Sequence, residues 1–252
     1  MKLERAKHHL DELRIEIINF NHGDHHRIIF NQEIKGGEIK GILSIKDFPP
    51  FDKWAVIMGD IAHNLRSSLD LLACLLVKSY TPSSNCGDVA FPISKDVKSF
   101  NDRSLNKMAG ASPDAKAAIQ KLMPYGGGND LFYYISQLNN RDKHRLLIPT
   151  FTFVNKGNFY YQLNDGIPPG TKPIFNLTIN KPLVYENGAE FFRIFPENFN
   201  IDPETSADGE SALEVVFRKP RVVSGKPVLP LFSNAVSLVD DVLKIFEPMV
   251  TK

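Results

Sequence analysis

The stretch Gly59–Val77, GDIAHNLRSSLDLLACLLV, predicts an apolar helix with a concentrated polar cluster in its first half. At about 100° per residue, one set of apolar side chains shares a single face of this helix. That face carries Ile61, Leu65, Leu69, Leu72 and Leu76. The opposite face carries Asp60, His63, Ser67, Asp70 and Cys74. Because the helix becomes apolar almost all round after Asp70, its polar face is expected to run into a buried segment.

A second segment, Leu131–Leu147 (LFYYISQLNNRDKHRLL), shows the same conflict between burial and charge. Its inward-facing series is Leu131, Ile135 and Leu138. The next member of that series is Asp142, which Asn139 flanks, whereas His144 points to the far side of the helix. A buried, unpaired carboxylate costs about 3–5 kcal/mol, so Asp142 is expected to have a cationic or hydrogen-bonding partner.

Basic side chains on the two segments suggest specific partners for these carboxylates. A planar guanidinium can bind a carboxylate through two parallel hydrogen bonds. We therefore predict that the two helices pack together through a pair between Arg66 and Asp142. A second pair is predicted between Asp70 and either Arg145 or Lys143.

The composition is that of an ordinary globular protein. The chain has 252 residues, of which 42% are hydrophobic and 23% charged. Its net charge is +1, so binding of nucleic acid would require a local basic patch. The two cysteines, Cys74 and Cys86, are interpreted as a core thiol and a loop thiol rather than a disulfide framework. Without a signal-peptide core or an apolar run of about 20 residues, a cytoplasmic protein with no membrane association is expected.

The pattern along the chain predicts one α+β domain over residues 1–252. A helical bundle core is expected over 52–147, an antiparallel β region over 148–218 and a C-terminal helix over 231–250. The core should also contain a short helix near 97–109 and a helix that begins at Ser112-Pro113. Before the core, the sequence predicts a helix over 2–20 and strands over 26–32 and 38–45, joined at Lys35-Gly36-Gly37. Within the β region, strands are expected at 148–154, 159–163, 174–179, 190–194 and 212–218.

Two ordered signatures carry a family resemblance. They are GD-x-x-HNLRS-x-LD at residues 59–70 and N-x-DKHR at residues 140–145, with Phe91-Pro92-Ile93 and Pro124-Tyr125 between them. The chain resembles a widespread set of uncharacterised bacterial and phage proteins over roughly residues 52–150. More loosely, it is similar to HEPN-type helical domains, many of which are metal-independent RNases with an R-x4–6-H motif. This chain has Leu71 where relatives commonly have His, and none of its arginines is followed by His at that distance.

The charged cluster, defined as Asp60, His63, Arg66, Asp70 and Asp142, is open to three interpretations. It can be a structural network of buried ion pairs that fixes helix register. It can be catalytic, with His63 as a general base and Arg66 stabilising a phosphoryl-type transition state. A metal site is not favoured, because Asp142 and His144 diverge by about 200° on a helix. No cofactor is therefore expected.

Three other motifs have alternative interpretations. Gly126-Gly127-Gly128 before a helix can cradle a phosphate, but it lacks the Lys-Ser/Thr of a P-loop, which favours a plain turn. The histidines at 22, 25 and 26 are interpreted as part of a solvated turn rather than a metal site. The aromatic pair Tyr133-Tyr134 can stack on nucleic-acid bases, although core packing is the commoner role of such side chains.

The sequence thus predicts an interaction or ligand-binding module of a bacterial or phage conflict or stress system, with a structural charged cluster. The alternative is a HEPN-like, metal-independent RNase that uses His63, Arg66 and His144. The candidate binding residues are Asp60, Asn64, Asp70, Asn139, Asp142, Lys143 and Arg145. RNA, a protein partner or a second copy in a homodimer are the expected partners. An open basic cleft that exposes His63 and Arg66 would favour the enzyme, whereas burial of both would favour the module.

Overall fold

The computed structural model describes residues 2–23, 26–33, 38–143, 147–159, 175–178, 190–194 and 211–250. The sequence predicts one domain, and the chain divides into two compact units. The first unit comprises Met1–Ile15, Phe51–Pro149 and Phe217–Lys252. The second comprises Glu16–Pro50 and Thr150–Val216.

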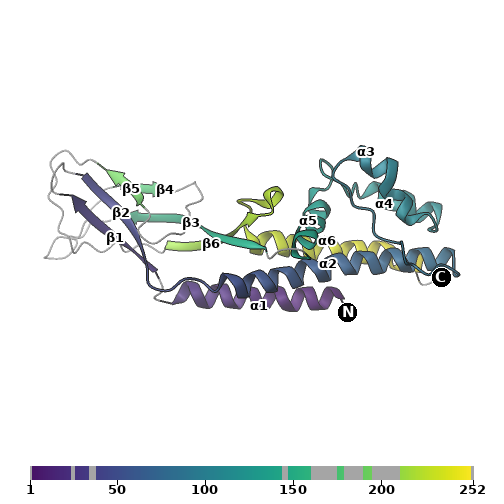
Figure 1. The fold of residues 1–252 in the computed structure, drawn as a ribbon, viewed down its shortest axis with the longest axis horizontal. Coiled ribbons are helices and arrows are strands. Elements are labelled where there is room, and N and C mark those ends of the chain that lie inside the picture. The colour runs from purple at the N-terminus through teal and green to yellow at the C-terminus, as the bar shows by residue number, and fades with distance from the viewer. Residues whose placement is uncertain are drawn as a thin grey trace. The chain divides into compact units, whose positions relative to one another are not determined.

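The first unit is a helical bundle, which confirms the predicted helical core (Figure 1). Its main helices are the first part of α1 (Lys2–His22), α2 (Phe51–Tyr80), α4 (Pro113–Lys121), α5 (Asp130–Asp142) and α6 (Val228–Val250). Three short helical turns join them, namely α3 (Val97–Ser99), the π-helix η1 (Phe100–Ser104) and the 3₁₀ helix η2 (Leu105–Met108); a further 3₁₀ turn, η3 (Arg221–Val223), precedes α6. Among the helices of the described residues, none combines the length and apolar character needed to cross a bilayer.

Helix α2 forms the centre of this bundle and packs against both α5 and α6. The apolar face predicted from Gly59–Val77 is confirmed, since its five members are buried: Ile61, Leu65, Leu69, Leu72 and Leu76. Aromatic rings from other elements complete the core. Phe91 stacks on Phe132 of α5, with ring centroids 5.7 Å apart. A fully buried aromatic side chain contributes about 1.5–3 kcal/mol to the free energy of unfolding. Because these two rings come from segments far apart in the chain, the core depends on contacts between distant segments.

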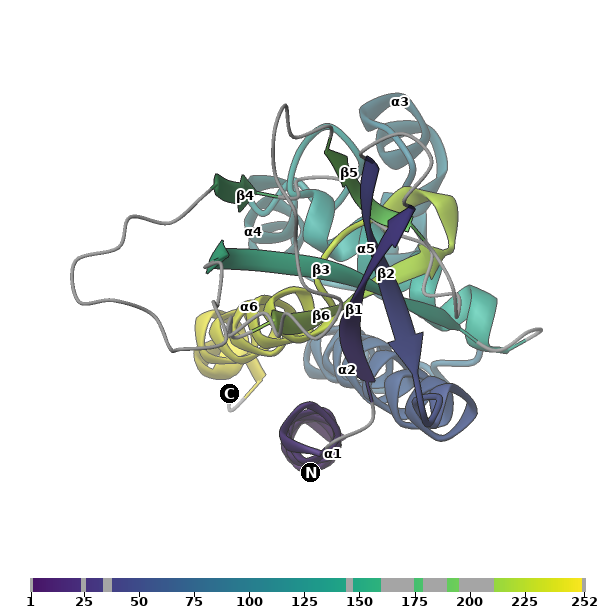
Figure 2. The same cartoon turned by 90° about the vertical axis from the view of Figure 1, so that its left-hand side faces the viewer.

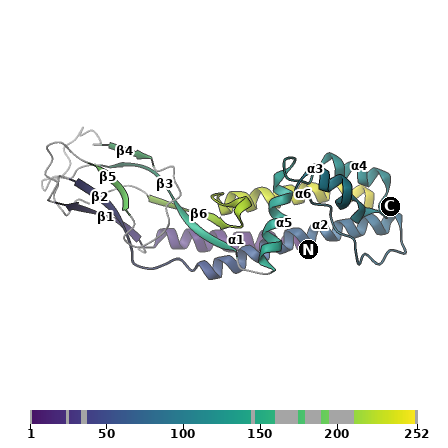
Figure 3. The same ribbon diagram turned by 45° about the horizontal axis from the view of Figure 1, so that its top comes forward.

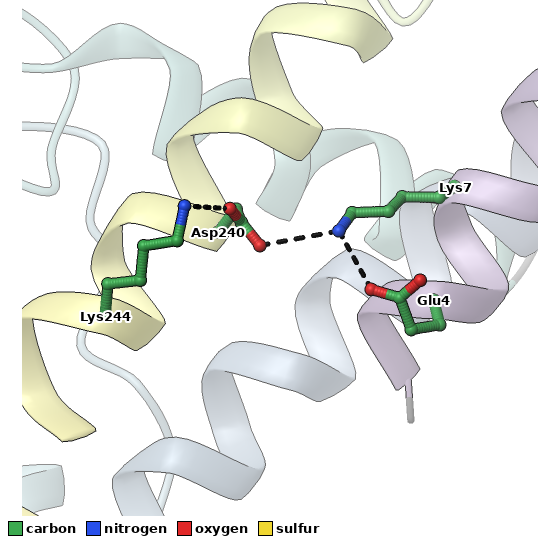
Figure 4. Close-up of polar contacts among 4 residues, drawn as sticks. All are labelled: Glu4, Lys7, Asp240 and Lys244. Carbon is green, nitrogen blue, oxygen red and sulfur yellow. Dashed lines mark hydrogen bonds and ion pairs between the residues drawn. The ribbon is translucent and has the colours of Figure 1, made fainter.

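The first part of α1 lies beside α2 (Figures 1 and 2). Its buried side chains follow helical spacing and are Leu3, Ala6, Leu10 and Leu13. Figure 4 shows a polar link to α6, in which Lys7 contacts Asp240 at 3.5 Å and Glu4 at 2.8 Å. Lys244 also binds Asp240, at 2.6 Å, and this hydrogen bond is the main reason that the pKa of Asp240 is lowered. Exposed ion pairs add little stability, so the apolar face contributes most of the attachment of α1.

The segment between α2 and α5 forms several short helices (Figure 3). One small helix was expected over 97–109, but α3, η1 and η2 follow one another there. Asp96 caps the first of them by accepting a hydrogen bond from the Ser99 N–H at 2.7 Å. The predicted start of α4 is confirmed, because the Ser112 hydroxyl accepts from the Ala115 N–H and Pro113 occupies the first turn.

In the second unit, β1 (His26–Glu33) pairs antiparallel with β2 (Glu38–Ile45), from His26↔Ile45 to Glu33↔Glu38. Strand β5 (Glu190–Ile194) pairs antiparallel with the other edge of β2. A second set of strands has the order β4-β3-β6, with bounds Phe175–Thr178, Ile148–Phe159 and Ser211–Lys219. The predicted connection at 35–37 and most of the predicted strand at 159–163 lie outside the described residues, so the antiparallel region as a whole stays a prediction.

The two cysteines form a disulfide, so the expectation of two separate thiols is wrong. Cys74 on α2 and Cys86 in the following loop have an S–S distance of 2.09 Å and Cα atoms 5.5 Å apart. Their separation of 12 residues gave no sign of this pairing, because it depends on the loop folding back along α2. Cys86 has a positive φ of 58°, an uncommon conformation for a residue with a side chain.

Breaking this bond should destabilise the first unit. By the chain-entropy account, a crosslink around a loop of this length contributes about 2–3 kcal/mol. We expect wild-type protein in thermal melts to lose stability on addition of dithiothreitol, whereas Cys74→Ala/Cys86→Ala should begin destabilised and show no response. Titration of two free thiols in native protein without reductant would contradict the bond.

Candidate functional site

The most extensive polar contact in the described residues of α2 joins Arg66, Asp70 and the backbone of Phe91. Arg66 donates two hydrogen bonds to the Asp70 carboxylate, from Nε at 3.0 Å and from Nη2 at 2.7 Å. Its Nη2 also donates to the Phe91 carbonyl at 2.9 Å, and the Phe91 N–H donates to Asp70 Oδ1 at 2.9 Å. The Arg66 side chain is 13% exposed and that of Asp70 is 36% exposed. These contacts fix the loop after α2 to the helix.

The predicted pairing of Arg66 with Asp142 is therefore wrong, and so is that of Asp70 with Lys143. Arg66 binds Asp70, one turn away on its own helix, rather than Asp142. Asp70 binds Arg66 and the Phe91 backbone rather than Lys143, and Arg145 lies outside the described residues. An i,i+4 pair is already close within one helix, so it forms without ordering a second element. The sequence analysis paired both residues with residues of the other helix and overlooked the ion pair that they form within α2.

Asp142 instead lies against Gly59, where α5 ends on α2. A Cβ atom added to Gly59 would lie 2.0 Å from the Asp142 carboxylate oxygen, so only glycine leaves room for this side chain. The predicted helix to residue 147 is too long, because α5 ends at Asp142. The predicted burial of Asp142 is correct in part, since the residue is half-buried. The helices α2 and α5 thus meet as expected, but Arg66 does not pair with Asp142.

Burial raises the pKa of Asp142, the nearby Asp60 carboxylate raises it further, and His63 acts in the opposite direction. The folded pKa of this carboxyl therefore lies above its ordinary value of 3.8. Ionisation of Asp142 consequently opposes folding, and its effect on stability becomes less favourable as pH rises from 3.8 through the folded pKa.

His63 is exposed, and its ring contacts the side chains of Asn139 and Ser67. Its Nδ1 lies 3.4 Å from the Asn139 side-chain oxygen, and its Nε2 lies 3.4 Å from the Ser67 hydroxyl. Asn139 is 3% exposed, so the buried amide helps to orient the exposed ring. Asn64 is also buried, and its amide donates to the Asp60 carbonyl at 2.8 Å. The side chain of Asn64 is thus bound to the backbone of its own helix, and its predicted role in binding stays a prediction.

A cleft of about 500 Å³ lies beside these residues, between α2, α5 and the segment around 90–107. Among the described residues that line it, four side chains are cationic, namely Arg66, Lys95, Lys107 and Lys143, and Asp70 is the single carboxylate. The remaining polar lining is Ser94, Tyr133, Ser136, Gln137, Asn139 and Asn140. All three lysines are exposed. We call this feature the basic cleft.

Sequence reasoning selected some of these residues and missed others. Arg66, Asp70, Asn139 and Lys143 were predicted site residues, and the fold brings them together in the basic cleft. Lys95 and Lys107 were missed, because they lie in a loop and in the short helix η2, and nothing in the sequence places either beside α2 and α5. His63 and Asp60 lie in the neighbouring contact with Asn139 and Asp142, and the predicted catalytic His144 lies outside the described residues.

The glycine-rich turn does not add a phosphate cradle to this cleft. The Gly126 N–H donates to the Ser94 carbonyl, the Gly127 N–H to the Asp130 carboxylate, and the Gly128 N–H to the Tyr125 carbonyl. With these donors used within the chain, the plain-turn interpretation is the better one. Gly126 is also required by close packing, because a Cβ there would lie 2.4 Å from the Lys95 carbonyl oxygen.

The described residues also bear on a metal site and on stacking by the adjacent tyrosines. Within them, no group of three or more His, Cys, Asp or Glu side chains is placed to hold a metal ion. Of the two adjacent tyrosines, Tyr133 lines the basic cleft, whereas the ring of Tyr134 lies 5.0 Å beneath the Lys226 ammonium group. Only Tyr133 is therefore positioned to contact a ligand in the cleft.

Loss of either partner in the Arg66–Asp70 pair should destabilise the fold. Hydrogen bonds to charged groups contribute about 1.5–3 kcal/mol, and partial exposure reduces this, so we expect a loss of about 1–3 kcal/mol in urea unfolding. Arg66→Ala, Asp70→Ala and the double variant should show a coupling of about 1 kcal/mol or more. The exposed Arg14–Asp11 pair, 2.7 Å apart, is the matched control and should show much weaker coupling. Independent effects of the two substitutions would argue against the network.

The contact between Gly59 and Asp142 predicts that Gly59→Ala has opposite effects on stability in the presence and in the absence of the Asp142 carboxylate. Gly59→Ala should destabilise the native chain, because the new methyl group displaces the Asp142 carboxylate. In an Asp142→Ala background, the same change should stabilise α2 by about 0.5–1 kcal/mol through helix propensity. Urea unfolding of the four proteins measures the cycle. Equal effects of Gly59→Ala in both backgrounds would show that the two residues do not interact.

Comparison with protein-family models, with curated proteins and with solved structures finds no match to this chain. The resemblance to the uncharacterised bacterial and phage proteins, and more loosely to HEPN domains, therefore stays a prediction.

Proposed function

We propose that the chain is a ligand-binding module and that the basic cleft is its binding site for an anionic ligand. The observation that supports this most directly is the imbalance of charge in the cleft, where four cationic side chains meet one carboxylate. The chain as a whole has a net charge of only +1, so this local excess is not a reflection of bulk composition. A concave surface with one sign of charge concentrates ligands of the opposite sign.

In this proposal the pair formed by Arg66 and Asp70 is structural. Arg66 Nε and Nη2 are both engaged in bonds, and both Asp70 oxygens accept. Within the described residues, neither Lys107 nor Lys143 takes part in an ion pair, and Lys95 lies 3.8 Å from the carboxylate of its neighbour Asp96. The lysines are therefore the charges that remain open to a ligand.

The wider setting is part of the same proposal. We infer an α+β chain with an HEPN-like helical core and an antiparallel β region, acting in a bacterial or phage conflict or stress system. A cytoplasmic location is also proposed. The Cys74–Cys86 disulfide is the main observation against that location, because disulfides are rare in reducing compartments.

Charge reversal in the cleft tests the proposed function. Wild-type protein should melt at a higher temperature in the presence of tripolyphosphate, since a ligand that binds the folded state stabilises it. Lys107→Glu/Lys143→Glu should lose this shift, whereas Lys98→Glu/Lys121→Glu, with the same change in net charge outside the cleft lining, should keep it. Equal shifts in both double variants, or no shift in the wild type, would refute binding at this site.

A metal-independent RNase is the second candidate, and the exposure of His63 favours it. An exposed imidazole that contacts Ser67 and Asn139 is available as a general base next to a basic cleft. Arg66 is less suited to its predicted catalytic role, because its guanidinium already binds Asp70 and Phe91. His144 belongs to this proposal from sequence alone.

Cleavage of total RNA by purified protein tests this second candidate. His63→Gln is the informative variant, because Arg66→Ala would also disturb the fold. The matched control is His8→Gln, because His8 is also an exposed histidine but lies on a different helix, α1. Cleavage that is lost only in His63→Gln would support the RNase, whereas absence of cleavage, or equal cleavage by both variants, would remove it.

A further inference from the structure

We propose that the natural ligand of the basic cleft is a phosphate monoester with a small, hydrogen-bonding organic body. This inference rests on the proposed function and specifies its ligand class. Two features of the cleft support it: the number of open ammonium groups and the polar side chains beside the lysines.

The charge of the cleft fits an anion with more than one negative charge. Arg66 and Asp70 neutralise each other through their two hydrogen bonds. The ammonium groups of Lys95, Lys107 and Lys143 then remain, and they come from three separate segments. A phosphate monoester carries about −1.5 to −2 charge at neutral pH and has three strong acceptor oxygens, whereas a single carboxylate carries one charge. Three lysines are therefore better matched to a phosphate.

The type of cation also suits a phosphate. A guanidinium binds carboxylate and phosphate groups alike through two parallel hydrogen bonds. In this cleft the guanidinium of Arg66 already grips Asp70 in that manner. Lysine acts as a point charge and is a common phosphate ligand. The available donors therefore suit a tetrahedral anion that is approached from several directions.

The rest of the cleft provides contacts for the body of the ligand. Gln137 and Asn140 of α5 offer amide donors and acceptors, and Tyr133 adds a ring and a hydroxyl. The volume of about 500 Å³ lies within the range of about 300–1,000 Å³ that small-molecule sites occupy. The site is thus large enough for a phosphate together with a sugar or nucleoside, and its neutral lining favours hydrogen-bonding groups over a hydrocarbon chain.

Isothermal titration calorimetry with defined probes tests this assignment. The probes are AMP, ribose 5-phosphate, inorganic phosphate, adenosine and citrate, each at the same low ionic strength. The tighter of the two esters should bind at least about tenfold more tightly than inorganic phosphate, adenosine or citrate. Lys107→Ala and Lys143→Ala should each weaken that ester by about tenfold, as expected for a charge-assisted hydrogen bond. Lys121→Ala, an exposed lysine outside the cleft, should leave its affinity within about twofold.

The outcomes separate the ligand class from the proposed function. If citrate binds as tightly as the esters and depends on the same lysines, the phosphate assignment is wrong and anion binding stands. If inorganic phosphate matches the esters, the organic body has no role and the inference fails in that part. If none of the anions binds, or if the lysine variants bind as the wild type does, both the inference and the proposed function are refuted.

Discussion

The salt bridge between Arg66 and Asp70 is the interaction on which the rest of the helical unit depends. It lies within one helix, yet it also makes two hydrogen bonds to the backbone of Phe91, 21 residues beyond Asp70. The ring of that same residue is completely buried and stacks on Phe132 of α5. One residue of the loop is thus held by charge through its backbone and by apolar contact through its ring. This combination brings α2, the following loop and α5 together at one place.

The sequence was sufficient to predict the helical core, because its main elements have strong periodicity or clear end signals. The apolar face of Gly59–Val77 and the capped start at Ser112 are examples, and both depend on residues close in sequence. The short helices between residues 97 and 108 were not resolved in advance, since three different helical geometries follow one another there. The end of α5 at Asp142 was also missed, because the apolar residues that close the segment at residue 147 suggested a longer helix.

The candidate site was predictable in its residue types but not in its pairing. Asp142 was correctly expected on the face that meets α2, but its neighbour there is a glycine rather than an arginine. A glycine gives no charge signal, so the space that it leaves becomes visible only when both helices are placed. Lys95 and Lys107 were missed for a related reason, because a basic surface formed by segments that are separate in sequence depends on tertiary structure. The cysteine pairing was likewise invisible from spacing alone.

The loop after α2 is tied to that helix at two points, by the bond between Cys74 and Cys86 and by the contacts of Phe91 with Arg66 and Asp70. Lys95 follows four residues after the second tie, so its backbone is already ordered before any ligand arrives. Ordering a loop during association lowers affinity, and a chain restrained in advance avoids much of that entropy loss. If the basic cleft binds a ligand as proposed, the two ties would hold the backbone under its lysine side chains in place before binding.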